Sequence, residues 1–278
     1  MSNSPILNRD LKQNCVKSVL KKEIQNPAEV TDDVVTCQEL EKANLVINQF
    51  IKSCSHAMRG PLKSIRGLVN ILKDRNPTTD LDPAVVIRFI EENTEKMEII
   101  LEELEQFMFN SSQETKNKSI DLDELVLQVT TNFQKEIKKQ AIDVTIQVQQ
   151  PSPFYSDPAR IRLILGHLLT NAITFQRAEN PNKKISIQCS VALNECVLAV
   201  EDNGIGIESD QHGNIFEIFY QATSNPHGSG IGLFIVREAL EKMGGTIAID
   251  SQPGQGSIFK FTLPNLAVKV GQQRLKQT

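Results

Sequence analysis

Several features that would assign a protein to a special class are missing from this chain of 278 residues. No apolar run approaches the roughly 18 residues of a transmembrane helix, and the N-terminus lacks the apolar core of a signal peptide. The five cysteines form no C-x-x-C pair and have no metal-ligand spacing, which is typical of reduced thiols. These absences predict a cytoplasmic protein without a membrane span, a disulfide framework or a cysteine metal site.

An excess of positive charge is also missing. The formal net charge is −4 and the pI is about 5.7, which disfavours nucleic acid or an anionic membrane as the main partner, because both require a basic face. Hydrophobic residues make up 40% of the chain, enough for packed cores, and the length allows two domains. No internal repeat or low-complexity segment is present.

The N-terminal part divides into an arm and a helical region. Residues 1–38 are polar and mixed; a short apolar side within them favours a docking helix or a mobile arm over a helix lying on a membrane. Residues 39–112 carry apolar residues at steps of three and four, which predicts two helices, the second starting at Asp82-Pro83. The first stripe comprises Ile47, Ile51, Cys54, Met58, Leu62, Ile65, Val69 and Leu72, and the second runs from Val86 to Met108.

Two such helices joined by a short segment form an antiparallel hairpin. A hairpin this narrow cannot bury both stripes, so we expect two copies to pair into a dimeric four-helix bundle. On the first helix His56 lies two residues from both Cys54 and Met58, and therefore faces away from the apolar stripe. Pro61 removes one backbone donor from this helix and should bend it.

From Ser119 onward the pattern predicts an α+β domain over residues 119–265, after a polar linker and before a tail at 266–278. The apolar segment Cys196–Val200 predicts a central strand. Gly244-Gly245 should end the last helix. Expected helices cover about 123–140, 157–178 and 230–243, and expected strands cover about 142–148, 183–191, 195–202, 246–251 and 257–263.

Three blocks in this domain indicate a nucleotide pocket. Asp202 ends a buried strand, where it can accept a hydrogen bond from an exocyclic amine, and Gly204 and Gly206 let the backbone pass close to a flat base. The same Asp-Asn-Gly sequence is also good turn chemistry. The block Gly228-Ser229-Gly230-Ile231-Gly232-Leu233 opens a helix, where backbone N–H groups form an anion site.

The third block places Asn171 inside an apolar helix. A buried asparagine requires a partner, and its side-chain oxygen can bind Mg²⁺ beside the phosphates. An internal polar contact is the alternative. The glycine block around Gly230 lacks the lysine and Ser/Thr of a P-loop and does not follow a strand, so it is a different phosphate cradle.

Together these blocks resemble the ATP-binding domain of sensor histidine kinases, in the superfamily that includes gyrase, heat-shock chaperones and mismatch-repair ATPases. The resemblance covers about residues 30–265. Residues 160–175 are similar to the family's N-box, 202–207 and 228–233 to its two glycine boxes, 215–220 to its F-box, 254–259 to its closing strand entry, and 53–67 to the H-box.

The resemblance implies a histidine autokinase of a two-component system. It would transfer the γ-phosphate of ATP to His56 and then to a response-regulator aspartate. Asp202 would contact adenine and Asn171 would hold Mg²⁺. The segment between Gln221 and His227 would be a mobile lid, anchored by Phe216, Phe219 and Tyr220. Gly204, Gly206, Gly228, Gly230, Gly232 and Leu233 would shape the ATP pocket. The implied partners are a second copy of the chain, a receiver domain and an upstream sensor.

The chain departs from the family pattern at several positions. Ala57 replaces a common acidic residue after the histidine, and Gly60 a common Thr or Asn. His167, Thr174 and Gln221 replace an asparagine and two basic residues of the ATP domain. These changes leave a second hypothesis open, a phosphotransfer or signalling module with weak or no autokinase activity. A chaperone- or gyrase-like ATPase is a third, which the histidine hairpin disfavours.

Overall fold

The computed structural model describes residues 27–73, 82–222 and 228–267, with side chains from residue 45 onward. The chain divides into two compact units, and the boundary follows His56 inside the first long helix. The amphipathic segment predicted within residues 1–26 lies outside the described residues. None of the described helices combines the length and apolarity needed to cross a bilayer.

The helical region consists of α2 (Pro27–Lys73) and α3 (Pro83–Ser112), the hairpin that the two apolar stripes predict. α2 begins at a proline inside the segment predicted to be an arm, where the missing N–H costs a helix nothing, and it continues as an α-helix through Pro61. At the start of α3, the Asp82 side chain accepts a hydrogen bond from the Ala84 N–H at 2.9 Å. The predicted cap at Asp82-Pro83 is therefore confirmed.

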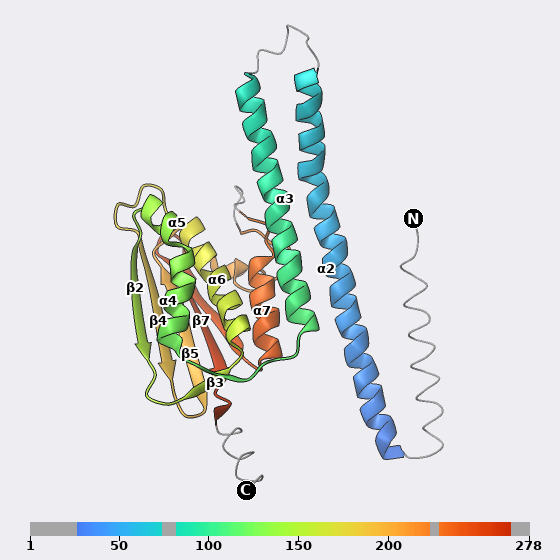
Figure 1. The fold of residues 1–278 in the computed structure, drawn as a ribbon, viewed down its shortest axis with the longest axis vertical. Helices are drawn as coiled ribbons and strands as arrows, with labels where there is room; N and C mark the ends of the chain where they lie inside the picture. The colour runs from blue at the N-terminus through green and yellow to red at the C-terminus, as the bar shows by residue number, and fades with distance from the viewer. Residues whose placement is uncertain (1–26, 74–81, 223–227, 268–278) are drawn as a thin grey trace. The chain divides into compact units, whose positions relative to one another are not determined.

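The remainder of the second unit is a mixed α/β domain, as predicted (Figure 1). Its main sheet has five strands in the order β2-β4-β5-β7-β6, with β2 and β4 parallel and the other pairs antiparallel. The strands are β2 (Asp143–Gln149), β4 (Lys184–Val191), β5 (Glu195–Asp202), β6 (Thr246–Gln252) and β7 (Gly256–Pro264). The apolar strand β5 is central, which confirms the prediction from Cys196–Val200.

Helices pack on one face of this sheet, so the domain has two layers. They are α4 (Leu122–Asn132), α5 (Gln134–Lys139), α6 (Pro158–Thr174) and α7 (Gly232–Lys242), followed at Gly244 by the predicted left-handed stop (φ +70°). Burial alternates along β4 and β5, whose inward side chains join those of α4, α6 and α7 in one hydrophobic core. Alternation of buried and exposed side chains is expected for a sheet that is covered by helices on one face only.

Within the α/β domain, the helix expected over 157–178 ends at Thr174, and two larger differences concern other elements. The single helix expected over 123–140 is broken at Phe133, which packs against the core with ψ near 8° and caps both α4 and α5. Two strands of three residues, β1 (Lys118–Ile120) and β3 (Phe154–Ser156), form a separate small sheet. Three residues are too few for a period-2 pattern, so the sequence did not predict them.

Candidate nucleotide site

The end of strand β5 forms one wall of the candidate site. The Asp202 carboxylate accepts a hydrogen bond from the Gly204 N–H at 2.8 Å. A Cβ atom placed on Gly204 would lie 2.3 Å from the Phe175 carbonyl oxygen, at the end of α6. That carbonyl also accepts from the Ile205 N–H at 3.0 Å. The loop after β5 therefore presses its backbone against α6, which only a residue without a side chain allows.

Asp202 is electrostatically unusual. Burial raises the pKa of its carboxyl to about 6, against the hydrogen bonds from the Gly204 and Ser257 backbones, which favour the ionised form. A carboxylate that is largely desolvated and still has free acceptor capacity is suited to receive a hydrogen bond from an amine of a bound ligand. The structure thus places the predicted adenine contact in a setting where such a bond is strong.

Gly206 continues this wall. Its backbone is left-handed (φ +71°), and a Cβ atom would lie 2.0 Å from the Gln252 carbonyl oxygen at the end of β6. The neighbouring Ile207 N–H donates to the Ser251 hydroxyl at 2.8 Å, which fixes the loop against the β6–β7 turn. The first glycine box is therefore held between α6 on one side and the edge of the sheet on the other.

The second glycine box lies at the start of α7. Gly228 (φ +113°) is exposed, and its carbonyl accepts from the Gln221 amide at 2.9 Å. Gly230 (φ +78°) is tightly packed, since its Cβ would lie 2.8 Å from the Phe219 backbone, and its carbonyl accepts from the Phe219 N–H. Residues 223–227 of the predicted lid lie outside the described residues. The F-box aromatics Phe216 and Tyr220 pack against the core.

Gly232 and Leu233 form the first turn of α7, whose N-cap residue makes no side-chain capping bond. His167 of α6 packs against this turn, with its Nδ1 atom 2.9 Å from a Cβ placed on Gly232. Burial lowers the pKa of His167 to about 4, and its Nε2 atom is buried without a hydrogen-bond partner among the described residues. The imidazole is therefore neutral at the positive end of a helix.

Asn171 lies one helical turn after His167, so the two side chains share a face of α6. It is partly buried, and among residues 82–222 and 228–267 its side chain makes no hydrogen bond. The internal polar contact considered from the sequence is therefore not found in the described part of the chain. An amide oxygen free in this way is available to a metal ion or to its water ligands.

The structure brings together two groups of the predicted residues. Asp202, Gly204 and Gly206 form one wall beside the end of α6, while Gly230, Gly232 and Leu233 form the start of α7 beside His167. Gly228 stands in open space. His56 lies on α2, exposed, and belongs to the other compact unit.

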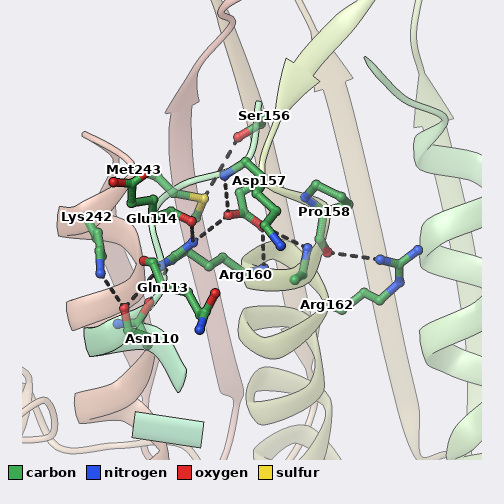
Figure 2. A network of polar contacts seen from close by, with 12 residues as sticks. Asn110, Gln113, Glu114, Ser156, Asp157, Pro158, Arg160, Arg162, Lys242 and Met243 are labelled. Carbon is green, nitrogen blue, oxygen red and sulfur yellow. Dashed lines mark hydrogen bonds and ion pairs between the residues drawn. The ribbon is translucent and has the colours of Figure 1, made fainter. Parts of the chain in front are cut away.

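Arg160 is a structural residue of this domain that sequence reasoning missed (Figure 2). It is 1% exposed and forms an ion pair with Asp157. Its other N–H groups donate to the Asn110 side chain at 2.8 Å and to the Asn110 and Gln113 carbonyls at 3.1 and 2.6 Å. Arg160 thereby joins the end of α3 to the start of α6. The only local signal was an Asp and an Arg three residues apart at the start of a helix.

Comparison with known proteins gives the class. Residues 156–267 match the family described as "Histidine kinase-, DNA gyrase B-, and HSP90-like ATPase". The chain is 30% identical over 227 residues to the methanogenesis regulatory histidine kinase FilI of Methanothrix harundinacea, covering 81% of this chain and 25% of that protein. It is 32% identical over 257 residues to the circadian input-output histidine kinase CikA of Synechocystis, with 88% and 34% covered.

Solved structures share the fold. The histidine kinase ThkA, in complex with the response regulator protein TrrA, superposes with a TM-score of 0.65 at 22% identity, covering 81% of this chain and 64% of that chain. The Acinetobacter baumannii histidine kinase AdeS gives 0.60 at 22% identity, with 76% and 98% covered. On the evidence of the family match and the curated relatives, the chain belongs to the sensor histidine kinases and carries their ATPase domain. It spans between a quarter and about a third of the two curated relatives named above.

Proposed function

We propose that the chain is an ATP-dependent histidine autokinase of a two-component system, in which His56 receives the γ-phosphate and passes it to a response-regulator aspartate. The observation that carries the proposal is the desolvated Asp202 carboxylate. Next to it, the loop backbone packs so closely against the end of α6 that position 204 has no room for a side chain. A flat base with an exocyclic amine fits such a wall. Membership of the sensor histidine kinases supplies the reaction class.

The residues present fit ATP and Mg²⁺. The uncapped start of α7 and the packed Gly230 offer backbone N–H groups to phosphate oxygens. The free amide of Asn171 would hold Mg²⁺, which neutralises phosphate charge when bound. In the transfer, a nitrogen lone pair of the His56 imidazole would attack the γ-phosphorus. The bond from phosphorus to the bridging oxygen would break, and ADP would leave with the electron pair.

The proposal includes a homodimer. Large apolar side chains of the hairpin are exposed in the single chain, for example Ile51 at 45% and Leu62 at 48% on α2. Others on α3 are Ile87, Phe89, Ile99, Leu101, Met108 and Phe109. Apolar stripes on two long helices are buried when two hairpins form a four-helix bundle. A receiver domain and an upstream sensor complete the proposed set of partners.

The test is phosphorylation of the purified chain. Incubated with γ-labelled ATP and Mg²⁺, the chain is expected to acquire label that is lost in acid and stable in base, as a phosphorus–nitrogen bond requires. Adding a receiver domain should then remove the label from the chain. ATP binding without any phosphoprotein, even with a receiver present, would contradict the autokinase proposal.

A second candidate is a signalling module with weak or no autokinase activity. Gln221 stands where relatives often carry a cation, and its side-chain amide donates to the Gly228 carbonyl. His167 is neutral and partly buried. Each missing contact to transition-state charge can cost about 10²-fold in rate. Nucleotide binding without acid-labile label in the experiment above would favour this candidate.

The pH dependence of adenosine binding tests the role of Asp202. Adenosine carries no phosphate that titrates, and the ionised Asp202 is the form that accepts from its amine. Since the pKa of Asp202 is about 6 in the free protein, affinity should be constant above pH 7 and fall about tenfold by pH 5. Asp202→Asn, which does not titrate, should give a flat profile. Parallel profiles for both proteins would contradict the assignment.

A further inference from the structure

One face of α3 docks along α7. Glu103, Phe107 and Asn110 are spaced by four and three residues, so they share that face. The centroid of the Phe107 ring lies 5.9 Å from that of the Phe234 ring, and Phe234 belongs to the first turn of α7. The Asn110 carbonyl accepts from the Lys242 ammonium at 2.6 Å, in the last turn of α7. The two helices therefore run side by side in the same direction (Figure 1).

At the Asn110 end the contact is polar and satisfied. Arg160 donates to the Asn110 side chain and carbonyl, and Lys242 donates to the Asn110 and Ser111 carbonyls. These carbonyls belong to the last turn of α3, which has no intrahelical donors for them. Cations near the C-terminus of a helix also interact favourably with its dipole. This end of the contact is a stable anchor.

At the Glu103 end the contact between α3 and α7 is electrostatically unfavourable. The nearby Ser229 hydroxyl favours the ionised form of Glu103, but the Oε2 atom of this carboxylate is buried without a partner among the described residues. The Gln106 Oε1 atom, one turn further on, is buried in the same condition. Burial raises the pKa of Glu103 to about 7, and the neighbouring Glu102 adds to the shift. An unsatisfied, desolvated carboxylate makes this end of the contact weak.

Ser229 belongs to the second glycine box. Its hydroxyl oxygen also accepts from the Ile231 N–H at 3.0 Å, immediately before the uncapped first turn of α7. The proposed function assigns this turn to the phosphates of the nucleotide. At a pH above its pKa of about 7, Glu103 therefore brings a negative charge from α3 to the place where the triphosphate would bring its own.

We propose that Glu103 is an internal anion that latches α3 onto the second glycine box and competes with the phosphates of the nucleotide. This inference rests on the proposed function. Binding of a triphosphate would repel the Glu103 carboxylate and open the latch, while the Arg160 and Lys242 anchor keeps the other end of α3 in place. The latch would lower the affinity of the protein for a nucleotide, and this loss would grow with the number of phosphates that the nucleotide carries. The adenine contact would be unaffected.

The test compares the full chain with Glu103→Gln at pH 8, where a carboxyl with a pKa of about 7 is mostly ionised. Glutamine keeps an acceptor for Ser229 and removes the charge, and a neutral group is favoured where burial already disfavours the carboxylate. Affinities for adenosine, ADP and a non-hydrolysable ATP analogue, with Mg²⁺, would be measured by calorimetry. Compared with the wild type, we expect the variant to bind the ATP analogue about five- to tenfold more tightly. Its affinity for ADP should rise by a smaller factor, and its affinity for adenosine should be unchanged.

Glu105→Gln is the matched control, because Glu105 is an exposed carboxylate two residues along the same helix, and its affinities should equal those of the wild type. Unchanged affinity of Glu103→Gln for the ATP analogue would overturn the latch, as would an equal gain for adenosine and the analogue. If the wild type binds no nucleotide at all, both the latch and the proposed ATP site are overturned. Binding by the wild type with no phosphate-graded gain overturns the latch alone.

Discussion

With His56 replaced by alanine, the chain is expected to acquire no acid-labile phosphate from ATP and to bind ATP as tightly as the wild type. The substitution removes the proposed acceptor nitrogen, and no other described histidine can take its place. His167 is partly buried and packs against Gly232, and burial lowers its pKa to about 4. His212 is partly buried, with Nε2 3.3 Å from the Ile207 carbonyl. His56 is exposed on a long helix, where an approaching γ-phosphate can reach it.

Ser55→Ala is the matched control for this experiment. Ser55 is also exposed, and its hydroxyl donates to the Ile51 carbonyl at 2.9 Å within α2. Its loss should leave helix and phosphorylation essentially unchanged. Label and affinity should be measured on the same preparations, since loss of both would indicate unfolding. Acid-labile label of normal intensity on His56→Ala would show that the acceptor is another residue.

Arg160→Met is expected to destabilise the ATPase domain by about 3–5 kcal/mol. Methionine fills much of the volume but leaves the Asp157 carboxylate buried without its cation, and the Asn110 side-chain oxygen and the Gln113 carbonyl without the donor that Arg160 supplies. Burial opposes ionisation of Asp157, yet hydrogen bonds from Lys116 and Arg160 and the guanidinium charge hold its pKa below the ordinary value. Removing one partner of such a pair costs far more than the pair itself contributes.

Urea unfolding at pH 7, followed by far-UV circular dichroism, would measure this loss. Arg162→Met is the control, because Arg162 is an exposed arginine on the same helix and its loss should change stability by no more than about 0.5 kcal/mol. Arg160→Lys should fall between the two, since an ammonium cannot reproduce the planar fork of five donors. Equal midpoints for Arg160→Met and Arg162→Met would show that the buried network contributes little.

The succession of elements was predictable because it depends on local patterns. Apolar residues at steps of three and four defined α2 and α3, and Asp82-Pro83 defined where α3 begins. The alternating and apolar segments gave the five main strands, including the central position of β5. The break at Phe133 was not predictable, because it depends on a side chain packing into a core formed by distant elements.

The candidate site was predictable to a similar degree. Asp202 and the glycines could be proposed from the sequence because strand ends and glycine-rich helix starts are recognisable in consecutive residues. The outcome at Asn171 required the structure, since only the surroundings of a side chain show whether its amide is free. The same holds for His167, whose neutrality follows from burial against Gly232.

By itself, the sequence determined the class of protein, the order of the helices and strands and the residues from which a nucleotide pocket is proposed. These properties follow from neighbours along the chain and from blocks in a fixed order. Only the tertiary structure decided how Arg160 joins α3 to the ATPase domain and how Glu103 meets Ser229. Arg160 and Asn110 lie 50 positions apart. No local pattern specifies such a pairing, because its energy comes from burial that exists only once the chain has folded.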